Sequence, residues 1–162
     1  MTRLSLPPGR QGARVEVARG PDWSFMAWRS PRGLCVAWAA GSAENWARAC
    51  GRPHTGADEG PQHLIVSLLS VSADSDGLGA VVGAVTPDVA RVELELAGGT
   101  TLASATELAP AVTTDGRFFL VRVPASLLEQ QFERGGPMTS PVRTYSFFAE
   151  DGYLLERYAI PG

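Results

Sequence analysis

Lysine is absent from this chain of 162 residues, and all fourteen basic side chains are arginine. Asparagine occurs once, at Asn45. Both shortages are typical of coding bias in a GC-rich genome, where arginine takes surface positions that lysine takes elsewhere. The arginines are scattered along the sequence, which argues against an arginine motif for anion binding. The net charge of -3 argues against nucleic acid as a partner, because phosphate binding needs a basic patch.

Long apolar runs are also missing. No stretch approaches the eighteen or more apolar residues of a membrane-spanning helix, so no membrane span is expected. The stretch from Met1 to Pro8 lacks the apolar core of a signal peptide. The chain is therefore expected to be extracytoplasmic, secreted or in the cell envelope, if a signal segment was removed, and cytoplasmic otherwise. Residues 1–12 are expected to form a flexible arm, and residues 13–162 a single β-sandwich domain.

Residues that carry chemistry are few. His54 and His63 are the only histidines, and no Gly-x-Ser-x-Gly elbow accompanies them. Asp74 to Gly77 resembles part of a calcium loop, but the further oxygen ligands and the terminal Glu do not follow. Gly77 to Gly79 lacks the third glycine and the helix of a phosphate loop. The sequence therefore predicts no catalytic residue, no metal site and no cofactor.

Cysteine occurs only twice, at Cys35 and Cys50, on either side of a loop-rich stretch. In an extracytoplasmic domain these two residues would form a disulfide. In the cytoplasm they would remain two buried thiols. Without a pair of histidines beside them, they cannot complete a zinc site.

Alternating strand patterns and turn signals fill most of the chain. From Val89 to Leu96, apolar Val92, Leu94 and Leu96 alternate with charged residues, which indicates a strand with one buried face. Residues 23–30 and 33–39 form a hairpin candidate around Ser30 to Gly33, in a register that places Phe25 near Trp38. With Gly, Pro and Asp turns at regular intervals, the pattern predicts a mainly β, antiparallel sandwich of about eight to ten strands.

One or two short helices are expected beside the strands. Residues 42–50 have a serine that can cap a helix, and Gly51 follows as a stop. Such a helix would bring Cys50 back to Cys35 on the hairpin. Residues 124–134 carry apolar side chains at helical spacing and form the second candidate.

Four tryptophans lie in the first third of the chain, at positions 23, 28, 38 and 46. Most of this aromatic surface is expected to pack in the core around Cys35. Aromatic side chains on a sheet can also bind sugars or protein partners. Trp23, Trp28 and Trp46 are therefore the candidate contacts for a ligand or partner.

Several segments together resemble uncharacterised actinobacterial-type exported proteins. They are the strand pair from Ala80 to Leu96, the Gly116 to Phe119 strand, the closing hairpin from Phe148 to Gly152, and the pair Gly33-Leu34-Cys35 and Cys50-Gly51. The resemblance implies an immunoglobulin-like β-sandwich and a cell-envelope or secreted location. It implies no activity, since a fold alone does not determine one.

Three functions remain open on these observations. The first is a non-enzymatic, extracytoplasmic interaction or structural module that binds an unknown protein or cell-envelope partner. The second is a module that binds carbohydrate or another ligand through exposed aromatic side chains. The third is a hydrolase, which would need His54 or His63 beside an acid and a nucleophile.

Overall fold

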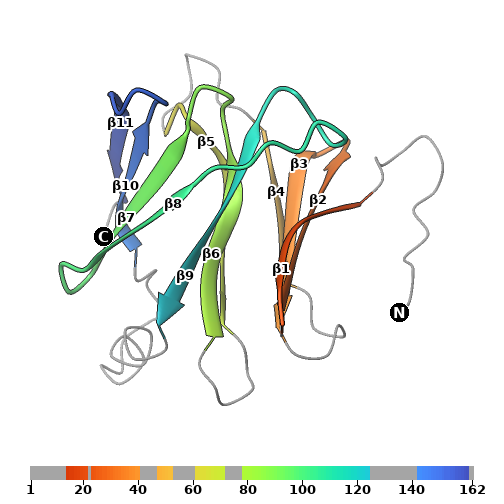
Figure 1. The fold of residues 1–162 in the computed structure, drawn as a ribbon, viewed down its shortest axis with the longest axis horizontal. Helices are drawn as coiled ribbons and strands as arrows, with labels where there is room; N and C mark the ends of the chain where they lie inside the picture. Colours follow the sequence, from red (N-terminus) through yellow and green to blue (C-terminus); the bar gives the residue numbers. More distant parts are fainter. Residues whose placement is uncertain are drawn as a thin grey trace.

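The computed structural model describes residues 14–21, 23–40, 47–52, 61–71, 78–124 and 142–160 (Figure 1). Within these ranges the chain is all β, and eleven strands follow one another with no helix between them. Their bounds are β1 (Val15–Gly20), β2 (Trp23–Ser30), β3 (Gly33–Ala40), β4 (Ala47–Gly51), β5 (Leu64–Val71), β6 (Leu78–Val85), β7 (Arg91–Leu96), β8 (Thr101–Ala105), β9 (Arg117–Pro124), β10 (Val142–Phe148) and β11 (Leu154–Ala159).

The strands form three antiparallel sheets. Their strand orders are β1-β2-β3-β4, β5-β6-β9 and β11-β10-β7-β8. Figure 1 shows the three-stranded sheet between the two four-stranded sheets. The predicted antiparallel β class is confirmed, and the described strands outnumber the eight to ten expected.

Two apolar cores lie on opposite faces of the middle sheet. Val82 and Ala84 of β6 belong to the core shared with β1–β4, while Val81 and Val85 belong to the core shared with β7 and β10. Because alternate residues of a strand point to opposite faces, a strand covered on both sides is apolar throughout. This explains why β6 is a continuous apolar run, whereas β7 alternates between apolar and charged residues.

Gly83 of β6 lets the three strands of the middle sheet lie closely together. A Cβ atom at this position would lie 2.2 Å from the carbonyl oxygen of Val66 and 2.7 Å from the ring of Phe119. The sequence pattern suggests a bulge or a close approach at this glycine, and the structure shows the close approach.

The hairpin β2–β3 has the predicted register. Phe25 lies opposite Trp38, and Ala27 lies opposite Val36. Gly33 closes the turn with a φ of 108°, which favours glycine. The ring of Phe25 meets that of Phe118 edge to face, with centroids 6.5 Å apart, and so fastens this hairpin to the middle sheet.

The prediction of a helix over residues 42–50 is wrong for residues 47–50. Ala47–Gly51 is β4, an edge strand paired with β3. Ala47 and Ala49 are half-buried opposite Trp38 and Val36, while Arg48 and Cys50 are exposed. This period of two suits an edge strand, and pairing with β3 overrides the capping signals that favoured a helix.

Several other expectations lie outside the described residues. These are the flexible arm over residues 1–12, the second helix beyond Pro124, which is the last residue of β9, and Trp46. Among the described residues, no helix has the length and apolar character needed to cross a membrane.

Candidate functional site

A disulfide joins β3, an inner strand of the first sheet, to β4, the edge strand beside it. Cys35 and Cys50 lie directly opposite each other on β3 and β4, with their Cα atoms 4.1 Å apart. The pairing that the sequence predicts for an extracytoplasmic chain is therefore present. A strand brings Cys50 to its partner, where the sequence indicated a helix.

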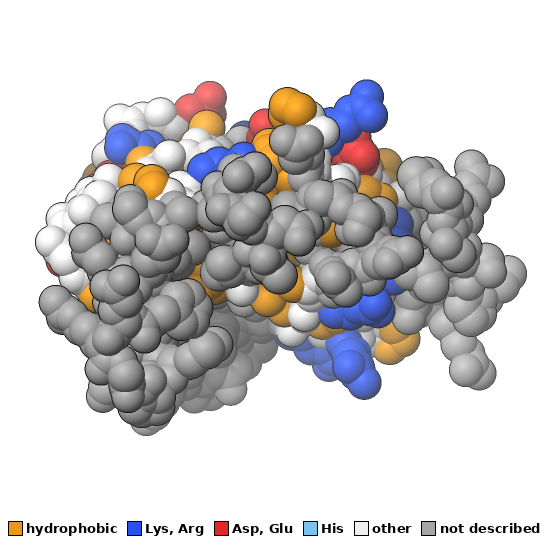
Figure 2. Space-filling model, turned by 90° about the horizontal axis from the view of Figure 1, so that it is seen from below, with side chains coloured by type: hydrophobic (Ala, Val, Ile, Leu, Met, Phe, Trp, Pro, Cys, Tyr) orange, Lys and Arg blue, Asp and Glu red, His pale blue; other side chains and the backbone are white. Residues whose placement is uncertain are grey.

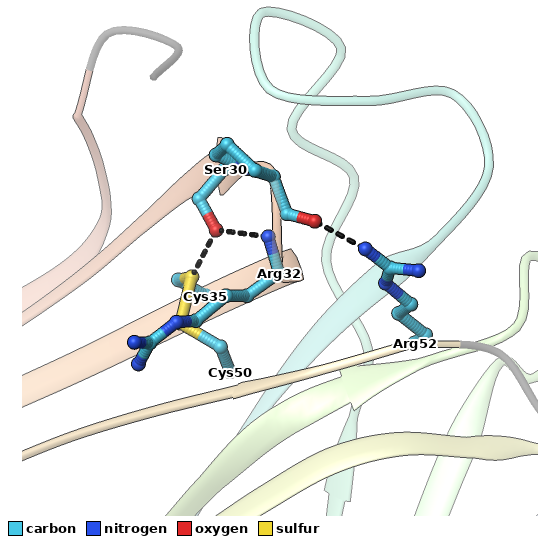
Figure 3. The surroundings of a disulfide bond; sticks show 6 residues. Ser30, Arg32, Cys35, Cys50 and Arg52 are labelled. Atoms are coloured by element: carbon cyan, nitrogen blue, oxygen red, sulfur yellow. Dashed lines mark hydrogen bonds between the residues drawn. A yellow bond between two sulfur atoms is a disulfide. The ribbon is translucent and has the colours of Figure 1, made fainter. Parts of the chain in front are cut away.

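A small polar network surrounds this disulfide (Figure 3). The hydroxyl oxygen of Ser30 lies 3.2 Å from Sγ of Cys35 and accepts a hydrogen bond of 3.0 Å from the backbone N–H of Arg32. The guanidinium of Arg52, which follows β4, donates to the carbonyl oxygen of Pro31. The β2–β3 turn is thus tied to the end of β4 at the disulfide.

The sheet β1–β4 turns one side away from the core, and we call this side the disulfide face. Trp28, Cys35 and Ala37 form its apolar centre and are at most 3% exposed. The guanidinium of Arg14 lies over the ring of Trp28, 4.4 Å from its centroid. At the other edge of the sheet, Arg48 of β4 lies opposite Ala37 of β3. Two arginines on outer strands therefore flank an apolar centre.

Charge is distributed unevenly among the sheets. Among the described residues, the segment holding β1–β4 carries six arginines and one acid, namely Arg14, Arg19, Arg29, Arg32, Arg48, Arg52 and Glu16. The other described segments carry five arginines against eight acids, namely Arg91, Arg117, Arg122, Arg143, Arg157, Asp88, Glu93, Glu95, Glu107, Asp115, Glu150, Asp151 and Glu156. In Figure 2, arginine side chains gather in the half that holds β1–β4. The arginine excess of β1–β4 therefore belongs to one continuous stretch of the sequence, residues 14–52.

Arg14 is half-buried on this face. Its Nε is buried and has no hydrogen-bond partner among the described residues. Burial, together with the nearby charge of Arg48, lowers the pKa of Arg14 from its usual value. Two cationic groups close enough to repel each other would gain from an anion placed between them.

The predicted tryptophan contacts do not form one surface. Trp23 is half-buried, packs with the core on the inner side of β2 and lies over Gly20. The guanidinium of Arg122 is 5.5 Å from its ring centroid. Trp28 points to the opposite side, the disulfide face, under Arg14. A ligand-binding role for Trp23, Trp28 and Trp46 stays a prediction.

A cluster around His63 connects the middle sheet to the sheet β11-β10-β7-β8. The Nδ1 atom of His63 is 2.8 Å from Oε1 of Glu156 on β11, and Nε2 is 3.4 Å from Oδ2 of Asp88 in the β6–β7 turn. Backbone N–H groups of Gln62 and His63 donate to the Glu156 carboxylate, each at 2.9 Å. No local sequence signal points to this cluster, because His63 and Glu156 are 93 positions apart.

The electrostatics of this cluster favour an ionised Glu156. Burial alone raises the pKa of Glu156, but the hydrogen bonds from Gln62 and His63 and the charge of His63 outweigh it, so the pKa is lowered. The nearby hydroxyl of Thr86 donates to the carboxylate of Asp88. The cluster thus has the acid and the base of a hydrolase, but no described nucleophile contacts His63. Its visible role is to hold the two sheets together.

Within the described part of the chain, no three His, Cys, Asp or Glu side chains are placed to hold a metal ion. Comparison with protein-family models, with curated proteins and with solved structures yields no match to this chain.

Proposed function

We propose that this chain is a non-enzymatic, extracytoplasmic interaction module with an immunoglobulin-like sandwich. Its binding surface is the disulfide face of β1–β4, and its partner is an anionic polymer of the cell envelope.

One observation carries this proposal, namely the arginine excess of β1–β4 on a chain that is acidic as a whole. Arginine binds carboxylate and phosphate groups through paired N–H donors, and a rigid support reduces the entropy lost on binding. Arg14 is held against Trp28, and Arg48 stands on a strand tied to β3 by the disulfide. The guanidinium of Arg14 and the strand that carries Arg48 are therefore positioned before a ligand arrives.

The same sheet supports the proposed location. A disulfide persists in oxidising compartments and is rare in the cytoplasm, so the Cys35–Cys50 bond supports an extracytoplasmic location. The resemblance to exported proteins points the same way.

Binding of polygalacturonate, an acidic polysaccharide, tests the proposal. The wild-type protein should bind at low salt and release the polymer as salt rises, because screening weakens charge attraction. Arg48→Gln should weaken binding several-fold. Arg143→Gln, which removes an exposed arginine from β10, should leave it unchanged. Equal losses in the two variants, or equal binding of neutral dextran, would contradict the proposal.

Carbohydrate binding through aromatic stacking stays the alternative prediction. It would require aromatic rings on one surface, and Trp23 and Trp28 lie on opposite sides of β2. Dextran binding that is insensitive to salt and to Arg48→Gln would favour this alternative.

A further inference from the structure

We propose that Cys50 is a site of thiol–disulfide exchange, at which an external anionic thiol opens the bond to Cys35. This inference does not depend on the proposed binding function. It stands on three features of the disulfide: the unequal exposure of its two cysteines, a hydroxyl group beside the sulfur of Cys35, and an exposed arginine on the same strand face as Cys50.

The two cysteines differ in access. Cys35 lies on an inner strand and is 0% exposed, whereas Cys50 lies on the edge strand β4 and is exposed. An attacking thiolate must approach one sulfur and displace the other. Access therefore selects Cys50 as the sulfur attacked and Cys35 as the leaving group.

Ser30 is positioned to assist the departure of Cys35. Its hydroxyl oxygen accepts the N–H of Arg32, so its own proton can point toward Sγ of Cys35, 3.2 Å away (Figure 3). As the bond breaks, negative charge develops on that sulfur. A hydrogen bond to a charged acceptor is stronger than one to a neutral acceptor, so the Ser30 contact strengthens in the transition state.

An arginine on the same strand face as Cys50 defines the kind of thiol that is favoured. Arg48 is exposed two positions before Cys50, and Arg52 follows two positions after it. Side chains two positions apart on a strand share a face, so Arg48 lies on the face of β4 that carries Cys50. Arg52 lies beyond β4, and its guanidinium donates to the carbonyl oxygen of Pro31. A small thiol that carries carboxylates is thereby attracted and its thiolate form stabilised.

The exchange balances without a further reagent. A thiolate attacks Sγ of Cys50, a new sulfur–sulfur bond forms, and the Cys50–Cys35 bond breaks with its electron pair on Cys35. Solvent protonates the Cys35 thiolate. A second thiolate can attack the mixed disulfide at the external sulfur, which leaves Cys50 as a thiolate and releases the oxidised external disulfide. The protein disulfide is reduced by two electrons, and two thiols are oxidised.

The consequence for the fold is local. β4 has five residues and pairs on one side only, with β3. Reduction removes its covalent tie to β3 and frees the strand that carries Arg48. The disulfide face is thus placed under the control of the external thiol pool.

Glutathione, which is anionic, and 2-mercaptoethanol, which is neutral, are the probes for this site. The folded wild-type protein is treated with each thiol, quenched by alkylation and mapped by mass spectrometry. We expect the glutathione adduct on Cys50 and the alkyl group on Cys35. An adduct mainly on Cys35, or adducts that form only at urea concentrations that unfold the protein, would overturn the proposal.

Variants separate assistance from mere access. Ser30→Ala should slow the exchange by roughly tenfold, as expected for loss of a hydrogen bond to a charged group, and Ser30→Thr should restore much of the rate. Ser24→Ala is the matched control, because Ser24 is on the same strand but donates to Glu16. Arg48→Gln should slow the exchange with glutathione more than the exchange with 2-mercaptoethanol. Equal exchange rates for Ser30→Ala and Ser24→Ala would contradict the role assigned to Ser30. Equal slowing of the exchange with both thiols by Arg48→Gln would contradict the role assigned to Arg48.

Discussion

His63 and Glu156 show how a single pair of side chains connects two sheets. The imidazole and two backbone N–H groups converge on one carboxylate, at distances of 2.8 to 2.9 Å. The Glu156 side chain is 19% exposed, so solvent screens these contacts only in part. A charge-assisted network of this kind loses more than one hydrogen bond when its acceptor is removed.

Glu156→Gln should lower the free energy of unfolding at pH 7 by about 1–3 kcal/mol. Because the pKa of Glu156 is lowered on folding, its contribution is complete above the ordinary pKa of 4.5 and disappears as the pH falls through the lowered value. The variant should therefore lose less stability than the wild type on acidification below pH 4.5. Urea unfolding between pH 7 and pH 3, about the range in which a carboxylate titrates, measures both effects.

Glu95→Gln is the control for this variant, because Glu95 is exposed on β7. Its effect should stay within about 0.5 kcal/mol at every pH. Parallel acid curves for the wild type and Glu156→Gln would show that the cluster does not hold the sheets together.

The same pair marks a limit of sequence reasoning at this scale. His63 was visible as one of two histidines, but nothing near it in the sequence points to a glutamate on the last strand. The arginines show the same limit, since Arg14 and Arg48 come to the same side of one sheet only through the pairing of four strands. Contacts between distant residues depend on register, which composition does not determine.

At the scale of elements, turn and alternation signals were sufficient for most strands. The β2–β3 register and the alternation of β7 follow directly from their sequences. β4 did not, because a five-residue edge strand offers little periodicity and Ser42 and Gly51 matched helix-boundary preferences. An edge strand derives its structure from its neighbour, so local propensity is a weak guide there.

Gly83→Ala tests how tightly the middle sheet is packed. The added methyl group would contact backbone and an aromatic ring, so neither neighbour can yield easily. We expect a loss of about 1–3 kcal/mol in the free energy of unfolding, as for overpacking elsewhere. Thermal or urea unfolding measures it.

Gly98→Ala provides the comparison, because nothing lies within 4 Å of its added Cβ and its φ is not in the positive range. It should be nearly neutral. Similar stabilities for the two variants would show that the close approach at Gly83 is absent.

At the scale of the whole molecule, three sheets share two cores, and the disulfide links two strands of the outer sheet β1–β4. The middle sheet has neighbours on both faces, whereas β4 has a partner on one edge only. A covalent link is most useful where pairing is least extensive. The antiparallel β architecture could be predicted from the sequence, but its division into three sheets could not, because strand order depends on contacts distant in the chain.

Cys35→Ala with Cys50→Ala should lower the free energy of unfolding by about 3 kcal/mol, as expected when a loop of roughly fifteen residues is no longer closed in the unfolded chain. Reduced and alkylated wild-type protein should show a similar loss. Urea unfolding with and without reductant checks the prediction. An unchanged midpoint in both samples would show that the disulfide does not stabilise the sheet.

The central claim is that the disulfide face of β1–β4 is where this molecule meets an anionic partner. Its most direct test is a backbone and indole NMR titration of the oxidised protein with polygalacturonate fragments. We expect shift changes centred on Arg14, the Trp28 indole and Arg48, with little change on β7, β10 and β11. Changes confined to the sheet β11-β10-β7-β8, or spread evenly over the surface, would contradict it.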